Sequence, residues 1–136
     1  MDMENKVRQI RELVEAKREK FARVSDEVWA VPELYFHETK SAAILIKALK
    51  EEGFEVQEGV DGIPTAFIGT WGSGKPVIGI LGEFDALPSL SQEAGCWEHK
   101  EIVKGGPGHG CGHNALGAGA MAAAVAAKDY MEKNGL

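Results

Sequence analysis

Residues 77–88 read VIGILGEFDALP, an apolar run that leads into two carboxylates and a proline. The first five residues carry no polar side chain, which is typical of an interior strand that is covered on both faces. Strands of this kind occur in sheets flanked by helices, so the stretch predicts an α/β fold. Glu83 and Asp85 stand two positions apart, and we therefore expect both side chains on one face of an extended chain at the end of this strand.

Two segments upstream of this strand have the periodicity of amphipathic helices. Apolar residues recur at intervals of three, four or seven over residues 5–31, which predicts one long helix with a single apolar face. Pro32 ends it, because the residue before a proline avoids the helical conformation. Residues 39–52 predict a second helix, and Gly53 is a suitable stop signal for it.

The segments between the second helix and residue 77 have the patterns of strands. Apolar and polar residues alternate over 54–57, as expected for a half-buried strand, and residues 65–71 are rich in strand-forming types. The glycine-rich turn at 72–76 joins the second of these segments to the apolar run. This order of strand, turn and strand predicts a hairpin between residues 65–71 and 77–81.

The C-terminal part of the sequence contains a loop and a third helix. Residues 89–107 have no periodicity and predict a loop, whereas residues 115–135 predict a helix whose first turns are nearly all alanine and glycine. Such small side chains allow a neighbouring backbone to approach closely, and Asn134-Gly135 is a suitable helix end. Residues 1–136 thus predict a single α/β domain in which helices pack on a mixed sheet.

The composition excludes several classes of partner. The 136 residues carry a formal net charge of −6, and the lysines and arginines are scattered, so we expect neither nucleic acid nor a membrane surface as a partner. The charged N-terminus lacks the apolar stretch of a secretion signal. The two cysteines, Cys96 and Cys111, suggest no disulfide framework. Together these features predict a cytoplasmic protein.

The sequence GHGCGHN at residues 108–114 concentrates side chains that bind metals. In an extended chain His109, Cys111 and His113 point the same way, and Cys111 and His113 could reach a common ion. A carboxylate at the strand end, Glu83 or Asp85, could orient a ligating histidine. Two alternatives stay open: a cysteine nucleophile with a histidine base, and a flexible loop whose Asn114 caps the following helix.

Other reactive side chains have simpler interpretations. His37 precedes a helix and is expected to be a surface or capping residue, and His99 lies in a polar run expected to be solvated loop. Cys96 is interpreted as a buried or half-buried thiol without chemistry.

Two long motifs in this order resemble a known family. GILGEFDALPSLSQEAG at residues 79–95, followed by GHGCGHNALGAGA at 108–120, resembles the metal-dependent amidohydrolase branch of the aminoacylase/carboxypeptidase superfamily of zinc metallopeptidases. PELYFHETKSA at residues 32–42 is similar to the N-terminal segment of that family. The resemblance covers essentially the whole sequence, which then corresponds to the N-terminal portion of a longer catalytic domain.

The resemblance implies a set of site residues. Cys111 and His113 match the motif that supplies metal ligands, for two divalent ions that would be zinc or manganese. Asp85 matches the catalytic-site aspartate that orients a ligand. Glu83 stands where other branches have a ligand histidine, and the resemblance assigns a role neither to it nor to His109.

The resemblance also implies an activity. Family members hydrolyse the amide bond of N-acyl or N-aroyl amino acids, such as aminobenzoyl-glutamate, and some act on dipeptides or as carboxypeptidases. The glutamate base, the remaining ligands and a dimerising lid domain of the family have no counterpart in these 136 residues. We therefore expect this chain alone to be inactive, and the full-length protein to be a homodimer or hetero-oligomer. The alternative outside the enzyme class is a non-catalytic, truncated paralogue that acts as an interaction module.

Overall fold

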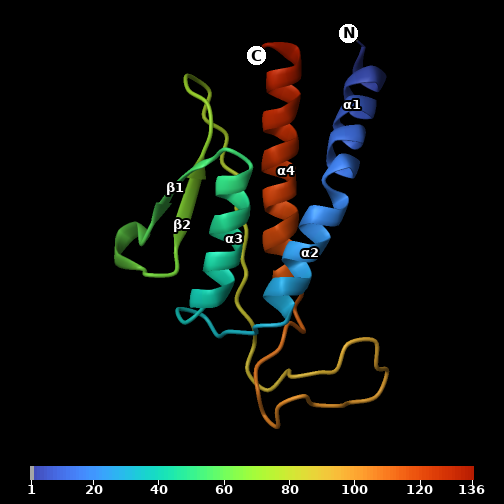
Figure 1. Cartoon of the computed structure of the whole chain (residues 1–136), viewed down its shortest axis with the longest axis vertical. Helices are drawn as coiled ribbons and strands as arrows, with labels where there is room; N and C mark the ends of the chain where they lie inside the picture. The colour runs from blue at the N-terminus through green and yellow to red at the C-terminus, as the bar shows by residue number, and fades with distance from the viewer. Residues whose placement is uncertain (1) are drawn as a thin grey trace.

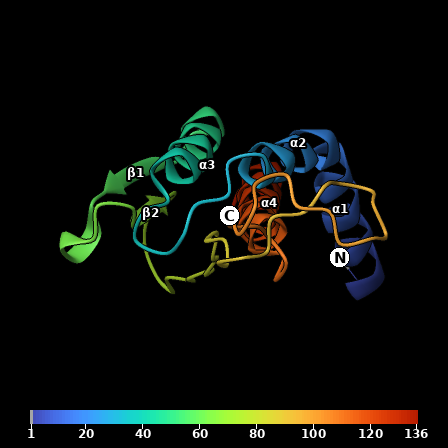
Figure 2. The ribbon, with the colours of Figure 1, turned by 90° about the horizontal axis from the view of Figure 1, so that it is seen from below.

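The computed structural model describes residues 2–136, which form four α-helices beside a small antiparallel sheet (Figure 1). Viewed from below, the sheet, α3, α4 and the α1–α2 pair follow one another across the molecule (Figure 2). The predicted α/β class is confirmed. The elements are α1 (Met3–Ala16), α2 (Arg18–Trp29), α3 (Thr39–Glu51), β1 (Glu55–Glu58), a short 3-10 helix (Val60–Gly62), β2 (Phe67–Thr70) and α4 (His113–Asn134).

Helix α4 contacts each of the other three helices and forms the centre of the core. Its alanine-rich and glycine-rich sequence presents Ala118, Met121 and Val125 to apolar residues of α2 and α3. The left-handed residue that closes it is Gly135, with φ of 65°, so the predicted stop is confirmed. The buried apolar cluster comprises Phe21, Val24, Val28, Leu45, Ala48, Leu49, Ala118, Met121 and Val125.

The prediction of one continuous helix over residues 5–31 is wrong. The helix is interrupted at Lys17, whose φ and ψ of −103° and 0° separate α1 from α2. Neither proline nor glycine marks this position, so the apolar periodicity alone gave no sign of it. The ammonium group of Lys17 lies 2.6 Å from a carboxylate oxygen of Glu52 at the end of α3, which ties the interruption to the tertiary structure.

The predicted partner of residues 65–71 is also wrong. Strand β2 pairs with β1 in an antiparallel ladder that sets Glu55 opposite Thr70. Residues 77–81 form no strand, and Val77 and Leu81 are 79% and 87% exposed. Strand β2 takes β1 as its partner instead, and the run passes beside the helices as irregular chain with no backbone hydrogen bond to the rest of residues 2–136.

The carboxylate of Glu52 is held by two lysines in the junction between α2 and α3. Its two oxygens accept hydrogen bonds from Lys17 at 2.6 Å and from Lys20 at 2.8 Å, and its side chain is only 8% exposed. Burial opposes ionisation and is the largest single influence, but the two lysines together outweigh it and lower the pKa of Glu52 below its ordinary value.

Glu52→Gln is therefore expected to lower the free energy of unfolding at neutral pH by about 1–2 kcal/mol, because both lysines lose a charged partner. Since the folded pKa is lowered, the stabilisation by Glu52 is complete above its unfolded pKa and is lost as pH falls through the folded pKa. Urea unfolding at pH 7 and in the acid range should show the difference between the two proteins shrinking with acidification. Glu58→Gln, which removes an exposed ion pair with Lys50, is the control and should have little effect at either pH.

No helix among residues 2–136 has both the length and the apolar character that crossing a membrane requires.

Candidate metal centre

The chain just beyond Glu83 and Asp85 is held from two sides. Ala86 donates its backbone N–H to the carbonyl of Glu33 at 2.8 Å and lies in an isolated parallel bridge. Leu87 and Gly108 form an isolated antiparallel bridge with two hydrogen bonds of 3.0 Å. One parallel and one antiparallel bridge thus lie side by side here, and together they fix the backbone that follows Glu83 and Asp85.

Glycines bring this stretch against the first turns of α4. A Cβ atom at Gly117 would lie 2.9 Å from the carbonyl oxygen of Glu83 and 3.3 Å from Cβ of Phe84. A Cβ atom at Gly82 would lie 3.0 Å from Cβ of Ala120. The expected close approach of a neighbouring backbone to the small residues of this helix is therefore present, and it brings Glu83 beside the N-terminus of α4.

His113 is the first residue of α4, and each of its ring nitrogens faces a carboxylate. Nδ1 lies 2.8 Å from Oδ1 of Asp85, and Nε2 lies 3.2 Å from Oε2 of Glu83. The side chains of His113 and Asp85 are 17% and 22% exposed, whereas that of Glu83 is 56% exposed. The three groups can each offer one ligand atom within 4.8 Å of the other two. The centre is thus half-buried on the Asp85 side and open on the Glu83 side.

This arrangement offers a place for a divalent cation. A neutral imidazole has one N–H and can donate to only one of two carboxylates, so its other nitrogen presents a lone pair. When Nδ1–H donates to Asp85, that lone pair belongs to Nε2 and lies beside the negative charge of Glu83. A divalent cation bound there would be coordinated by lone pairs of Nε2 of His113 and of the Glu83 carboxylate, while Asp85 would keep the imidazole ring in orientation.

The other two side chains of the predicted site lie outside this group of three. Cys111 is a free and exposed thiol, and it is not among the side chains gathered around His113. His109 buries both ring nitrogens, and neither has a hydrogen-bond partner among residues 2–136. Burial lowers the pKa of His109, and the neighbouring carbonyl of Val28 acts in the opposite direction without forming a hydrogen bond of good geometry. The roles assigned to Cys111, His113 and Asp85 as ligands and orienting group stay predictions.

Asn114 does not cap the last helix, which corrects the prediction made for it. The residue before α4 is Gly112, whose φ of 79° is left-handed, and no side chain caps the helix. The amide of Asn114 instead donates to the hydroxyl and the carbonyl oxygen of Ser25, at 3.0 and 3.3 Å. Asn114 thus connects the start of α4 to α2 and steadies the helix end that carries His113.

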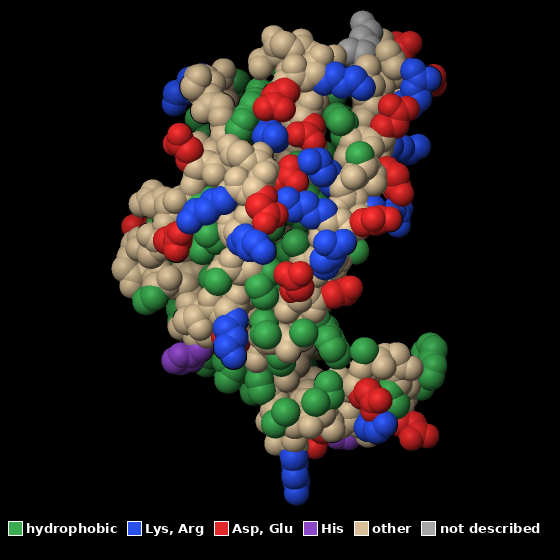
Figure 3. All heavy atoms as spheres, in the orientation of Figure 1, with side chains coloured by type: hydrophobic (Ala, Val, Ile, Leu, Met, Phe, Trp, Pro, Cys, Tyr) green, Lys and Arg blue, Asp and Glu red, His purple; other side chains and the backbone are tan. Residues whose placement is uncertain are grey.

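Residues 89–107 form an irregular arm, which confirms the predicted loop. The arm leaves and rejoins the molecule at the Leu87–Gly108 bridge, next to the candidate centre, and stands away from the helices as a separate lobe (Figure 3). Ser91 and Gln92 hold it together by accepting hydrogen bonds from the backbone of Val103 and Lys100, each at 3.0 Å. The arm contains His99, which is exposed, and Cys96, which is half-buried, as expected.

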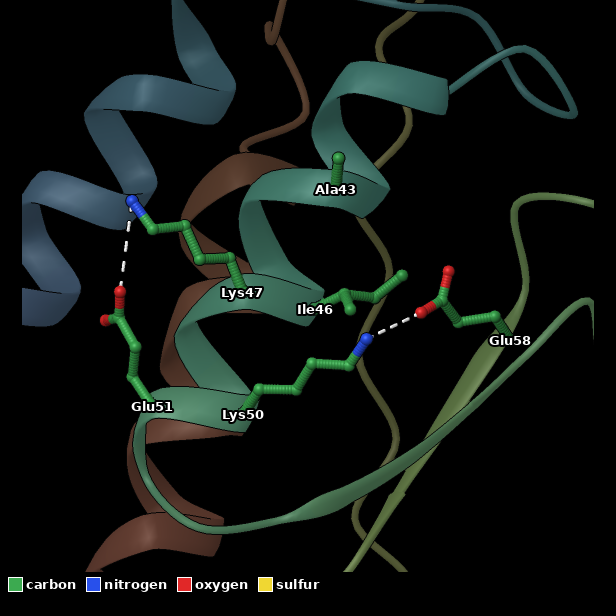
Figure 4. A pocket seen from close by; sticks show the side chains of 6 residues that line it. All are labelled: Ala43, Ile46, Lys47, Lys50, Glu51 and Glu58. Carbon is green, nitrogen blue, oxygen red and sulfur yellow. Dashed lines mark hydrogen bonds and ion pairs between the residues drawn. The ribbon is translucent and has the colours of Figure 1, made fainter.

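A shallow hollow between α3 and β1 carries no comparable chemistry. It is lined by Ala43, Ile46, Lys47, Lys50, Glu51 and Glu58 (Figure 4). Lys50 lies 2.8 Å from Glu58 across the hollow, and Lys47 lies 3.8 Å from Glu51 on the same helix. The charges are thus paired with one another, and the grouping around His113 is the better candidate for a functional site.

Comparisons with known proteins find relatives among hydrolases and peptidases. The chain is 47% identical over 133 residues to a subunit of p-aminobenzoyl-glutamate hydrolase from Escherichia coli, a match that covers 98% of this chain and 28% of that protein. It is 38% identical over 85 residues to thermostable carboxypeptidase 2 of Saccharolobus solfataricus, a match that covers 61% of this chain and 21% of the relative. The chain belongs to this family of amidohydrolases and peptidases.

A more distant relative within the amidohydrolase and peptidase family is the Xaa-Arg dipeptidase of Mus musculus. It is 27% identical over 135 residues, which cover 92% of this chain and 27% of the dipeptidase. No family model matches the chain. The chain spans about a quarter of the length of the curated relatives it matches.

Sequence reasoning left the placement of Glu83 unresolved, although a signal was present. Glu83 and Asp85 are two residues apart and were expected on one face, but nothing local showed that they would take opposite nitrogens of one imidazole. Glu33 gave no such signal: its carboxylate accepts hydrogen bonds from the backbone of Lys40 and Ser41 at the start of α3, and its carbonyl holds Ala86.

Proposed function

We propose that this protein supplies part of the metal centre of an enzyme that hydrolyses the amide bond of N-acyl or N-aroyl amino acids, such as aminobenzoyl-glutamate. The observation that carries the proposal is the position of His113, with Asp85 on one ring nitrogen and Glu83 on the other. The relationship to the Escherichia coli p-aminobenzoyl-glutamate hydrolase supports the substrate class.

The donor set fits a divalent ion of the zinc or manganese type. An imidazole nitrogen and a carboxylate oxygen are ligands that both metals accept, and a thiolate from Cys111 would favour zinc. The family resemblance implies two ions, which need more ligands than His113, Glu83 and Cys111 supply. We assign the remaining ligands, and the general base, to the part of the relatives that this chain does not span.

Bound divalent metal ions would supply a hydroxide nucleophile at neutral pH, by lowering the pKa of water to about 7, and would polarise the scissile carbonyl. The residues of this chain do the positioning. Asp85 would accept a hydrogen bond from Nδ1–H of His113 and so direct the Nε2 lone pair towards the centre. The exposed carboxylate of Glu83 keeps the open side of the centre negative, and the short bridge between Leu87 and Gly108 holds the loop of Cys111 close to the same point.

The 136-residue chain alone is expected to hydrolyse none of these substrates, because we assign the base and several ligands to the part of the relatives that it does not span. A chimera in which residues 1–136 replace the matching region of the Escherichia coli relative should hydrolyse aminobenzoyl-glutamate, and Cys111→Ala should abolish that activity. Product release measured by chromatography tests both statements. Turnover by the isolated chain that disappears with Cys111→Ala would contradict the proposal.

A dipeptidase or carboxypeptidase activity is the second candidate, favoured by the names of the two more distant relatives. A substrate panel on the same chimera separates the candidates, since only an aroyl-glutamate hydrolase would prefer aminobenzoyl-glutamate over dipeptides. The Escherichia coli relative is named as one subunit of its enzyme, which supports a further proposal that the full-length protein associates with itself or with a second kind of polypeptide.

A further inference from the structure

The turn between α2 and α3 leaves two adjacent aromatic rings exposed. Tyr35 and Phe36 are 61% and 62% exposed, and their rings meet edge to face with centroids 5.8 Å apart. Figures 1 and 2 show the connection between these helices at the end of the molecule where α4 begins. A pair of exposed rings is a surface against which a third aromatic ring packs favourably.

The backbone places this pair beside the candidate metal centre. Leu34, the residue before Tyr35, forms a parallel bridge with Ala86, and Ala86 directly follows Asp85. The carboxylate of Asp85 in turn lies 2.8 Å from Nδ1 of His113. Consecutive Cα atoms are about 3.8 Å apart and bridged ones about 5 Å, so the Cα atoms of Tyr35 and Asp85 are separated by no more than about 13 Å. A ring attached to a carbonyl at the centre is therefore within reach of the aromatic pair.

The backbone of Phe36 adopts a conformation that its side chain disfavours. Its φ is 63°, and the turn is closed by a hydrogen bond of 2.9 Å from the N–H of His37 to the carbonyl of Leu34. Left-handed φ values favour glycine, and for a bulky residue they are exceptional. Strained residues concentrate at active sites and ligand clamps, where the surrounding structure holds them in place. Phe36 stays exposed despite this strain, so a role in binding accounts for it better than a role in packing.

We infer that Tyr35 and Phe36 bind the aryl group on the acyl side of the substrate and so select aroyl over alkanoyl amino acids. This inference rests on the proposed function, and the Escherichia coli relative is named for an aminobenzoyl substrate, which carries such a ring. Contact between aromatic rings strengthens binding by roughly 2- to 12-fold beyond the burial of area. An aliphatic acyl group has no ring and gains none of this. The pair acts on the affinity for the acyl group and takes no part in the chemical step.

Phe36→Gly removes the ring and relieves the backbone at the same time. Glycine adopts a φ of 63° readily, so the Tm of the 136-residue chain should stay the same or rise. In the chimera with the Escherichia coli relative, kcat/KM for aminobenzoyl-glutamate should fall about 10-fold, through a rise in KM with kcat unchanged. The value for acetyl-glutamate should stay within about twofold of the original. Comparable losses for both substrates, or no loss for either, would overturn the inference.

Two further variants control for the bulk of the side chain and for backbone strain. Tyr35→Leu keeps an apolar side chain in place of a ring and should lower the preference for aminobenzoyl-glutamate over acetyl-glutamate by about threefold. Asp61→Gly relieves a left-handed φ of 51° in the turn between β1 and β2 without removing a ring, and it should leave both values of kcat/KM unchanged. A change of preference in Asp61→Gly equal to that in Phe36→Gly would assign the effect to the backbone and contradict the inference.

The outcomes separate this inference from the proposed function. If the unsubstituted chimera hydrolyses neither substrate, the proposed function is wrong and the inference fails with it. If the chimera is active but Phe36→Gly keeps the preference for aminobenzoyl-glutamate, the inference alone is wrong. A lower Tm of the Phe36→Gly chimera with that preference unchanged would show that the rings pack against the part of the relatives outside this chain, which also overturns the inference.

Discussion

His113→Ala is expected to weaken zinc binding by about 100-fold or more, since the loss of a ligand should cost at least as much as the loss of a group that orients one. The reason is geometric: Nε2 of His113 supplies the one nitrogen donor at the point where Glu83 and Asp85 converge. Competition with a chromophoric chelator, carried out on the chimera that contains residues 1–136, measures the change in Kd.

A companion substitution tests the carboxylate that faces Nδ1 of His113. Asp85→Asn should weaken zinc binding by about 10–100-fold, because an amide can no longer accept the Nδ1 proton with the same strength or fix the ring. His99→Ala removes an exposed imidazole from the arm and should leave Kd unchanged. An unchanged Kd for His113→Ala, with His99→Ala behaving in the same way, would remove the basis for a metal centre here.

Gly117→Val is expected to destabilise the chain by about 3 kcal/mol, the upper end of the usual cost of forcing extra atoms into a packed contact. Its Cβ atom would lie 2.9 Å from the carbonyl oxygen of Glu83, and backbone cannot move aside as a flexible side chain can. Displacement of Glu83 should also weaken zinc binding. Urea unfolding of the isolated chain measures the first effect, and chelator competition on the chimera measures the second.

The control for Gly117→Val is the same substitution two residues later. A Cβ atom at Gly119 would meet nothing within 4 Å, so Gly119→Val changes helix propensity alone and should alter stability by less than about 0.5 kcal/mol. Similar losses of stability in the two variants would show that the contact between α4 and residue 83 makes no specific contribution to the free energy of unfolding.

Local patterns predicted the helices well and the pairing of strands poorly. The helix over residues 39–52 and its stop at Gly53 were correct within a residue, because periodicity and left-handed glycine act over a few positions. The interruption at Lys17 and the partner of β2 were not predicted, since both depend on contacts with residues distant in the chain. The apolar run at 77–81 was predicted as an interior strand, but the sheet of the described residues consists of β1 and β2, and the run pairs with neither.

Local sequence patterns were enough to identify which segments are helical, where the second and last helices end, and which side chains could bind a metal. The hydrogen bond between Asp85 and His113, which are 28 positions apart, and the approach of Glu83 to the other ring nitrogen come from tertiary packing. The difference comes from how far apart in the chain the interacting residues lie. Backbone conformation and helix capping respond to neighbours along the chain, whereas the meeting of Asp85 with the first residue of α4 depends on how the whole core packs.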